Sequence, residues 1–433
     1  MPGKGDGYKL IRAGLLIDGR GGPPVHRGAV LIQGSTIRDS GPQKDVLPPE
    51  GAPVELLDYP DKAVMPGMVD CHTHHNGFGD GRLGDGLAKL PDEVLTLQSA
   101  RNARAALFSG VTSVRENGPK NVTMFRLRDA IREGRALGPR MVLCGRAVSI
   151  IGGHMGYFGS EVTGTNEARA MTRQLIKEGA DYIKITATGG STLTSFPLRP
   201  SFDVDELKAI TGEAQKFGVL TAAHCLSTQG IANSLDAGVD MIIHCVFKDA
   251  DGADIFREDV AERIGERGAH VNPTLHVYRA KIWAAQHKQA RQKLAPPDQR
   301  QLDEDRRAFE TRVEHSRRLI EMGLKVITGS DSSWGEYRLG NTAYEAECLV
   351  MAGYSPMQGV LSVTSEAAAA LGIDDVTGTL EPGKEADIVV IDGNPSEDVK
   401  DLWNVADVYL AGRRVDRGSD ESLATIRQMP PAG

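Results

Sequence analysis

Residues 63–76 read AVMPGMVDCHTHHN, a short apolar run that ends in three histidines, His72, His74 and His75. The apolar part has the length and composition of a buried β-strand. Side chains two positions apart on an extended chain point to the same face, so His72 and His74 can reach one cation together. The whole chain has only 11 histidines, and we interpret this segment as a strand that carries a metal-binding pair at its end.

Seven further strand-like runs follow, separated by helical stretches rich in Ala, Leu, Glu and Arg. They span residues 111–117, 140–148, 181–188, 219–225, 240–245, 270–278 and 325–331. Eight alternations of strand and helix predict parallel strands and a closed (β/α)8 barrel of the TIM type. Both ends of the chain are instead rich in short β-prone runs and turns. The sequence therefore predicts an α/β protein with a barrel over 64–372 and a small composite β-sandwich formed by 1–63 and 373–433.

Composition excludes several classes of protein. The chain has 433 residues and a net charge of −8, so it lacks the basic face that a nucleic-acid-binding surface needs. No run approaches the roughly 20 apolar residues of a membrane span, and the first residues show no apolar core of a signal peptide. Five widely spread cysteines do not suggest a disulfide framework. We expect a cytoplasmic, reduced protein that acts on a small molecule and forms a homo-oligomer.

Residues suited to metal binding stand at the ends of other predicted strands. Lys184 lies in the fourth, His224 and His244 end the fifth and sixth, and Asp331 ends the eighth. A single histidine or aspartate at such a position is ordinary, but a lysine in an apolar strand is costly to bury. In a TIM barrel all these strand ends meet on one face. Their joint occurrence therefore predicts a common site.

These residues resemble the amidohydrolase superfamily, in its imidazolonepropionase-like, metal-dependent subgroup. The opening YKLIRAGLLIDGRG, the hinge AVMPGMVDCHTHH and the closing GTLEPGKEADIVVIDGNP fit its pattern over nearly the whole chain. Similar proteins include Xaa-Pro-type dipeptidases, N-acyl amino acid carboxypeptidases and phenylurea hydrolases. The resemblance implies a distorted TIM barrel with a composite β-sandwich and a centre of two divalent metal ions, usually Zn²⁺.

The resemblance also implies a role for each residue. His72 and His74 match ligands of the more buried metal, and His224 and His244 match ligands of the outer metal. Lys184 matches a lysine that reacts with CO₂ to give a carbamate bridging the two ions, and Asp331 matches a metal-binding, proton-handling aspartate. Independently of the family, neutral histidines and carboxylates suit Zn²⁺. Metal-activated hydroxide can then attack a carbonyl, with Asp331 moving the proton to the departing nitrogen.

Other polar residues are candidates for substrate binding. His154, after the third strand, either polarises the carbonyl or is a loop histidine bonded to backbone. His276 and Tyr278 are two apart on the predicted seventh strand and would share a face towards the pocket. His75 is expected to serve the substrate or the surroundings of the ligands, and Trp334 to form an apolar wall.

Three further features are predicted to be structural or mobile. Arg115 and Asn117 are expected to make structural hydrogen bonds. Gly189 and Gly190, followed by STLTSFPLRPSFD, predict a mobile substrate loop. The polar stretch 285–310 predicts an exposed helical excursion or lid.

The sequence leaves several functions open. The leading hypothesis is hydrolysis of an amide-type bond in a dipeptide or N-acyl amino acid, whose carboxylate could meet Arg199, His276 or Tyr278. A phenylurea or carbamate hydrolase would use aromatic walls such as Phe158, Phe196, Trp334 and Tyr337. Opening of a cyclic amide is a further option. A metal-binding barrel without catalysis is a remote one, because fold alone does not establish activity.

Overall fold

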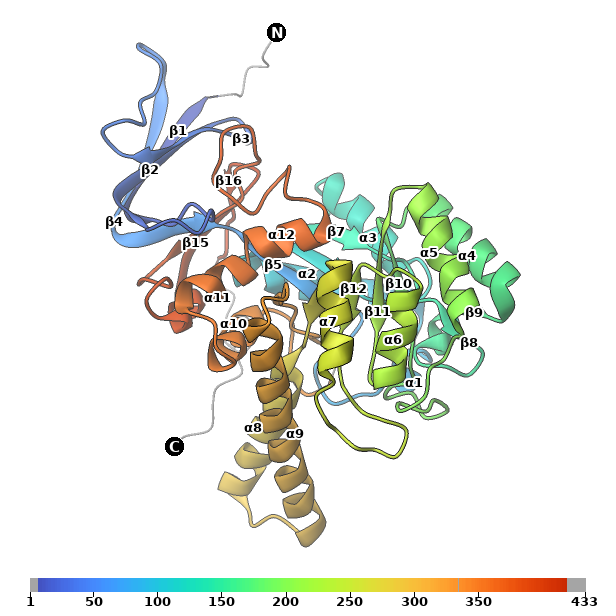
Figure 1. Cartoon of the computed structure of the whole chain (residues 1–433). Coiled ribbons are helices and arrows are strands. Elements are labelled where there is room, and N and C mark those ends of the chain that lie inside the picture. Colours follow the sequence, from blue (N-terminus) through green and yellow to red (C-terminus); the bar gives the residue numbers. More distant parts are fainter. Residues whose placement is uncertain (1–6, 334, 419–433) are drawn as a thin grey trace.

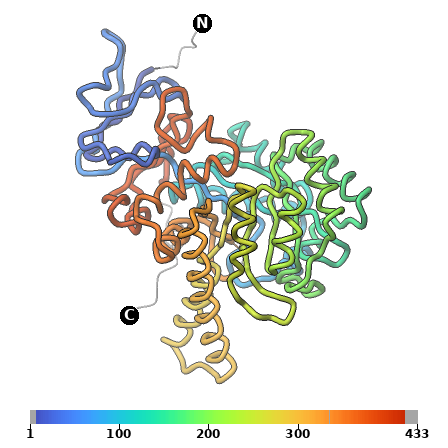
Figure 2. The backbone as a smooth tube through the Cα atoms, viewed as in Figure 1, coloured from blue at the N-terminus to red at the C-terminus, as the bar shows by residue number. Residues whose placement is uncertain are grey.

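The two ends of the chain build one seven-stranded sheet, in the order β16-β15-β14-β4-β1-β2-β3. The computed structural model describes residues 7–333 and 335–418. The strands of this sheet are β1 (Tyr8–Leu16), β2 (Val25–Gln33), β3 (Thr36–Pro42), β4 (Val54–Pro66), β14 (Ile388–Ile391), β15 (Val405–Leu410) and β16 (Arg413–Arg414). β4 pairs with β1 in parallel and with β14 in antiparallel orientation. The N-terminal and C-terminal segments therefore lie side by side (Figure 2). That this sheet folds into a two-layered sandwich stays a prediction.

The middle of the chain holds parallel strands that are almost entirely buried. One sheet has the order β5-β6-β7 and the other β10-β11-β12-β13. Their bounds are β5 (Met68–Thr73), β6 (Val111–Glu116), β7 (Arg140–Leu143), β10 (Tyr182–Ile185), β11 (Leu220–His224), β12 (Met241–Ile243) and β13 (His270–Asn272). A short parallel pair, β8 (Ser149–Ile150) and β9 (Glu161–Val162), lies after β7. Seven of the eight predicted runs are thus confirmed as strands.

Backbone hydrogen bonds connect the two parallel sheets on both sides. Asp181 N donates to Leu143 O over 2.7 Å, which joins β7 to the start of β10. On the other side, Val271 N donates to Lys325 O over 2.8 Å, and Cys71 N donates to Thr328 O over 3.2 Å. The strands therefore follow one another around a TIM-barrel-like core. The eighth run, 325–331, is no regular strand: it forms isolated parallel bridges only at its edges, at Val326 and Ser332.

Helices cover the outside of the parallel strands (Figure 1). The helical segments that precede β13 are α1 (Gly84–Leu87), α2 (Asp92–Phe108), α3 (Thr123–Arg132), the 3₁₀ turn η1 (Gly156–Phe158), α4 (Gly164–Glu178), α5 (Val204–Lys216), α6 (Thr228–Asp236) and α7 (Glu258–Arg267). Those after it are α8 (Leu275–Arg291), α9 (Pro296–Glu321), α10 (Thr342–Met351), α11 (Pro356–Ser362), α12 (Ser365–Leu371) and the 3₁₀ turn η2 (Val399–Trp403). Local signals set several of their ends. Asp203 and Glu206 form a capping box that begins α5, and Gly179, with φ of 102°, ends α4.

Helices α8 and α9 form a hairpin that projects from the body of the molecule (Figure 1). Buried Ile282, Leu294 and Leu302 pack between the two helices. The hairpin confirms the helical excursion predicted for 285–310. The predicted seventh strand, 270–278, is too long: β13 ends at Asn272, and the chain is helical from Leu275 onward.

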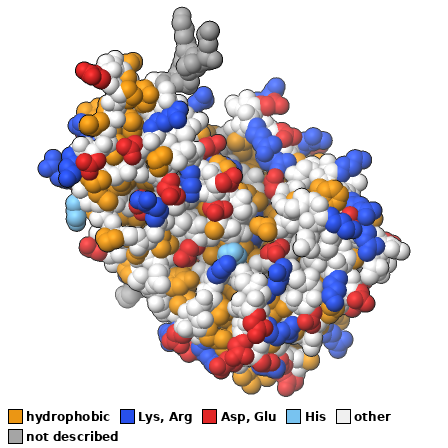
Figure 3. Space-filling model, turned by 45° about the horizontal axis from the view of Figure 1, so that its top comes forward, with side chains coloured by type: hydrophobic (Ala, Val, Ile, Leu, Met, Phe, Trp, Pro, Cys, Tyr) orange, Lys and Arg blue, Asp and Glu red, His pale blue; other side chains and the backbone are white. Residues whose placement is uncertain are grey.

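The surface agrees with the ordinary composition of the chain. Lys and Arg side chains are interspersed with Asp and Glu on the face drawn in Figure 3. Within the described ranges, none of the helices has the length and apolarity that crossing a membrane requires. Cys71, Cys144, Cys225, Cys245 and Cys348 are all buried and unpaired.

Candidate active site

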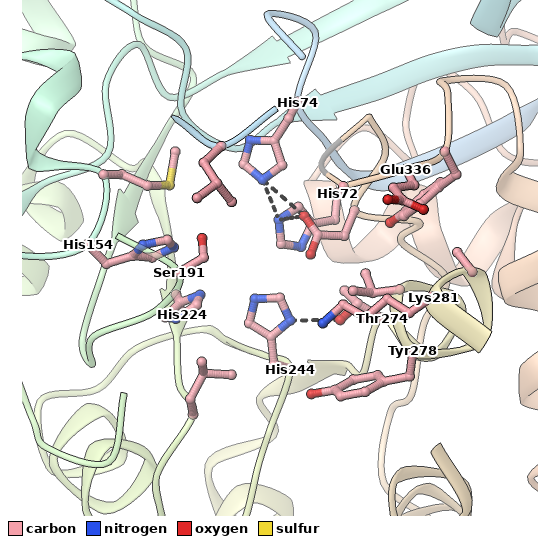
Figure 4. A pocket seen from close by; sticks show the side chains of 18 of the residues that line it. His72, His74, His154, Ser191, His224, His244, Thr274, Tyr278, Lys281 and Glu336 are labelled. Carbon is pink, nitrogen blue, oxygen red and sulfur yellow. Dashed lines mark hydrogen bonds and ion pairs between the residues drawn. The ribbon is translucent and has the colours of Figure 1, made fainter. Parts of the chain in front are cut away.

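A cavity of about 260 Å³ opens at the carboxyl ends of the parallel strands. All six residues predicted as metal ligands line it, together with His154 and Tyr278. Figure 4 shows the labelled rings of His72, His74, His154, His224 and His244 facing one space. The six come from different strand ends: His72 and His74 from β5, Lys184 from β10, His224 from β11, His244 from the residue after β12, and Asp331 from the eighth segment.

One carboxylate oxygen of Asp331 lies close to both histidines that β5 contributes. Its Oδ1 lies 3.1 Å from His74 Nε2 and 3.3 Å from His72 Nε2. Asp331 has a φ of 56°, and its N–H donates to His72 O over 2.7 Å, so the backbone turns the carboxylate inward. Ligand atoms of His72, His244 and Asp331 all lie within 4.8 Å of one another. These three side chains form a possible metal-binding group.

Hydrogen bonds behind the rings fix which nitrogen faces the cavity. His72 Nδ1 lies 3.1 Å from Asn272 Oδ1, and His244 Nδ1 lies 2.7 Å from Thr274 Oγ1. Each of these two rings therefore presents Nε2 to the cavity. Such partners orient histidine ligands and set their tautomer.

A buried polar network lies beneath the site. Asp70 accepts hydrogen bonds from His72 N, Ser330 N, Ser330 Oγ and Thr342 Oγ1. It thereby ties β5 to the segment that carries Asp331. Arg115 Nε and Asn117 Nδ2 both donate to Cys71 O, which bears out the structural role expected for them.

Lys184 is buried at 1% exposure, and its Nζ lies 3.4 Å from Asn117 Oδ1. Burial, followed by the nearby charge of Arg115, lowers the pKa of Lys184 to about 7. A lysine with this pKa is partly a neutral amine near neutral pH. The neutral amine is the form that can react with CO₂.

Four histidines of the cavity have a pKa below the usual value and are therefore neutral at neutral pH. Burial lowers the pKa of His244 to about 4 and that of His154 to about 3, and it moves the pKa of His72 and His224 well below the usual value. For Asp331, burial acts to raise the pKa, but the hydrogen bond from His74 and the neighbouring positive charges outweigh it and lower the pKa. Neutral imidazoles beside an ionised carboxylate are the protonation states that metal binding requires.

His75 and His276 lie in the interior and do not line the cavity. His75 is fully buried, and its Nδ1 lies 2.7 Å from Glu116 Oε2. His276 is also fully buried and packs edge-on against Trp283 and Tyr337. Neither is among the described residues that line the cavity. Of the two roles expected for His75, only the one in the surroundings of the ligands fits this position, and the expectation that His276 shares a cavity-facing side with Tyr278 is corrected. Trp334 lies outside the described residues.

The physical reason for the error at His276 is the change from strand to helix. His276 and Tyr278 both lie in α8, where residues two apart point to different sides. Tyr278 consequently faces the cavity and His276 faces the interior. Helical spacing instead brings Thr274, Val277, Tyr278 and Lys281 to the cavity.

Sequence reasoning missed several residues of the site. Lys281 lies at the cavity rim, one helical turn after Tyr278, and forms no ion pair among the described residues. Lys281 follows Tyr278 by three residues and Val277 by four, a spacing that places all three side chains on one face of a helix. This signal could be recognised only if the segment had been predicted to be helical. Asn272 and Thr274 carry no local signal, because their partners His72 and His244 are distant in the sequence.

Fold and site together define a class, a hydrolase with a TIM-barrel-like core and a cavity lined by histidines at its strand ends. The chain belongs to the Amidohydrolase family, whose profile matches residues 63–415. Members of this family are generally metal-dependent, and the protein is a hydrolase that acts on carbon–nitrogen bonds.

Individual relatives cover most of the chain. Ochratoxinase of Aspergillus niger is 27% identical over 424 residues, which cover 90% of this chain and 82% of the relative. Its crystal structure superposes with a TM-score of 0.79 at 25% identity and covers 96% of this chain and 98% of that one. A Xaa-Pro dipeptidase with methionine bound in its active site has a TM-score of 0.80 at 28% identity, covering 94% and 99%. Phenylurea hydrolase B, at 22% identity, has a TM-score of 0.78 with 98% and 100% covered, and shares the fold.

Proposed function

We propose that this protein hydrolyses the amide bond of a small substrate that carries a free carboxylate, a dipeptide or an N-acyl amino acid. The observation that carries the proposal is the position of Lys281. Its side chain lines the same cavity as Asp331 and the histidines, and its Nζ lies 5.8 Å from the centre of the Tyr278 ring. A cation there can bind the carboxylate while the amide lies over Asp331 and the histidines. The cavity of about 260 Å³ suits a small substrate.

One relative supports this substrate class. A Xaa-Pro dipeptidase acts on a dipeptide, and the methionine in its active site is an amino acid with a free carboxylate. It covers 94% of this chain at 28% identity. Apolar residues of the present cavity, among them Leu83, Met155, Leu226 and Val277, would pack against the uncharged part of such a substrate.

We further propose that His72, His74, His224, His244, Asp331 and a carboxylated Lys184 hold two divalent metal ions, most suitably Zn²⁺. When bound, these ions polarise the substrate carbonyl and lower the pKa of water. Asp331 accepts the proton of the attacking water and delivers it to the departing nitrogen. His154 donates a hydrogen bond to the carbonyl oxygen. Tyr278 and Lys281 hold the other end of the substrate.

The test is a hydrolysis screen of N-acyl amino acids and dipeptides, each paired with its C-terminal amide, on parent protein and Lys281→Met. We expect the parent to prefer the free acids. Lys281→Met should raise KM for the acids about tenfold, equivalent to about 1.4 kcal/mol, with kcat nearly unchanged. Lys288→Met, which alters an exposed lysine on the same helix that pairs with Asp298, is the matched control. Equal turnover of acids and amides by the parent would contradict the substrate class.

Hydrolysis of phenylureas or carbamates is the second candidate, favoured by the apolar walls of the cavity. It has less support, because Tyr337 alone of the described aromatic candidates lines the cavity. Phe158 is buried against Tyr157, and Phe196 is exposed outside the cavity. Phenylureas and cyclic amides belong in the same screen. Metal analysis separates all these enzymes from a barrel without catalysis, since an enzyme of this kind should hold close to two equivalents of transition metal.

A further inference from the structure

The segment 189–195, with sequence GGSTLTS, follows β10 and is tied down along its length. Ser195 Oγ accepts from Gly190 N over 3.0 Å and donates to Thr192 O over 2.9 Å. Thr194 Oγ1 donates to Gly152 O over 2.7 Å, which fastens the segment to the turn before His154. Its place beside the cavity fits the substrate loop expected from Gly189 and Gly190, but these bonds give it a fixed conformation.

This segment contacts two histidines of the cavity. Gly189 O lies 3.0 Å from His224 Nε2, so that ring nitrogen donates and Nδ1 faces the cavity. Gly190 lies flat against the ring of His154, and a Cβ at this position would come within 2.7 Å of ring atoms. Thr192 Oγ1 lies 3.0 Å from His154 Nδ1. The rings of His154 and His224 are 4.5 Å apart between centroids, so one short segment fixes a neighbouring pair of rings.

The hydrogen bonds of Thr192 determine where its proton goes. Met155 N lies 3.1 Å from Thr192 Oγ1, and a backbone N–H can only donate, so the threonine oxygen accepts there. Thr192 is buried at 5% exposure, and a buried hydroxyl proton needs an acceptor. Among the described residues, His154 Nδ1 lies at a hydrogen-bond distance of 3.0 Å and is the acceptor that carries no proton of its own in one tautomer. The Tyr157 hydroxyl, which also interacts with Thr192, carries its own proton. An imidazole that accepts at Nδ1 carries its proton at Nε2.

We propose that Thr192 is a positioning residue that holds His154 in the tautomer with its N–H at Nε2, directed at the substrate. Gly190 contributes by allowing the segment to lie against the ring. The proposal rests on the proposed function only in the role given to His154 as a donor to the carbonyl oxygen. The tautomer is inferred from the contacts of Thr192 with Met155 and His154 and does not depend on the identity of the substrate.

The first test measures the tautomer and needs no substrate. Parent, Thr192→Val and Thr192→Ser are labelled with ¹⁵N-histidine in the metal-loaded protein, and ring nitrogens are assigned to His154 by comparison with His154→Asn. We expect the parent and Thr192→Ser to show the proton at Nε2. Thr192→Val should shift a substantial fraction to Nδ1. Thr194→Val, which removes only the bond to Gly152, should leave the signal unchanged. A proton at Nδ1 in the parent would overturn the proposal.

The second test is kinetic and uses whichever substrate the screen identifies. A donor to the oxygen that gains charge acts mainly on kcat. We expect Thr192→Val to lower kcat about tenfold, with KM changed less than twofold and metal content equal to that of the parent. Thr192→Ser should restore most of kcat, and Thr194→Val should match the parent. If the tautomer shifts while kcat is unaffected, the positioning role in catalysis is overturned although the tautomer stands.

These outcomes separate this proposal from the proposed function. If no amide substrate is turned over, the proposed function fails, and the tautomer is still decided by the ¹⁵N measurement. Gly190→Ala gives a second variant that keeps the threonine hydroxyl. It should displace the His154 ring and lower kcat, and unchanged kcat with an intact fold would remove Gly190 from the positioning role.

Discussion

The side chains of the cavity depend on hydrogen bonds from the residues behind them. Asn272 and Thr274 each hold one nitrogen of a histidine ring, and Asp70 joins the backbone of His72 to that of Ser330. A ligand held in this way loses little rotamer freedom when a cation binds. Fixing the first contacts through a second layer of hydrogen bonds is how proteins tune metal affinity and orientation.

Asp331 should be indispensable for turnover but not for metal binding. Asp331→Asn keeps the shape and one oxygen of the side chain but removes the base. Proton transfer by a positioned group contributes typically about 10²–10⁴-fold, so we expect kcat to fall at least about a hundredfold. Most of the metal should remain, and KM should change much less. The measurement is kcat and metal content beside the parent, and near-parental kcat at full occupancy would exclude Asp331 from the mechanism.

Lys184 should act as a carbamate. Its buried position and a pKa near 7 supply the neutral amine for reaction with CO₂, and the product is an anion with two oxygens. Lys184→Ala should lose metal and activity together, and short carboxylic acids should restore part of both by replacing the bridge. Unmodified lysine far from the metal in electron density of an active, metal-loaded crystal would refute the prediction.

Helix α8 brings both Tyr278 and Lys281 to the cavity, so the position of its first turn matters for the site. Its first two N–H groups, of Leu275 and His276, donate to Glu345 Oε1 and Oε2 over 2.8 and 2.6 Å. Glu345 belongs to α10 and is fully buried. The start of the helical hairpin is therefore fixed by a carboxylate from a distant part of the chain.

The stability of this junction should depend on pH. Burial raises the pKa of Glu345 from 4.5 to about 8. A carboxyl whose pKa is raised on folding stabilises the fold below its unfolded pKa and loses that contribution as pH rises to the folded value. Glu345→Gln removes this titration, so the unfolding free energy of the variant relative to the parent should increase between pH 4.5 and 8. Urea unfolding at several pH values measures the difference, and a constant difference would contradict the prediction.

At the scale of the whole molecule, the terminal sheet supports the strand that carries the histidine pair. β14 pairs with residues 63–66 at the end of β4, and β5 begins two residues later. The C-terminal strands therefore cover an edge directly before the site. Within 7–63 and 373–418, no titratable residue lines the cavity, so we expect this sheet to have a structural role.

Removing residues 375–433 should consequently give insoluble protein. The deletion takes away β14, β15 and β16, so the side of β4 that pairs with β14 at residues 63–66 becomes an open edge, and such an edge promotes aggregation. Solubility after expression and the far-UV spectrum of any soluble fraction are the measurements. A soluble, fully active truncated chain would show that the sheet is dispensable.

The sequence by itself determined the strand ends and the residues that gather there. His72, His74, Lys184, His224, His244 and Asp331 follow apolar runs whose period and length are local properties. Parallel strands around a barrel-like core bring their carboxyl ends to one face, so the shared cavity followed from the topology. The histidine pair was visible because its spacing of two needs no information from elsewhere in the chain.

Only the tertiary structure decided what surrounds these residues. Residues 275–278 are apolar enough for a strand, but Glu345, about seventy positions away, holds the first N–H groups of a helix there. His75 turns to Glu116, and segment 189–195 is fastened by bonds to Gly152 and His154. Each outcome depends on a hydrogen-bond partner distant in sequence, and local propensity carries no information about such partners. For that reason the local sequence pattern located the residues that line the cavity, while the tertiary structure decided which neighbours orient their rings.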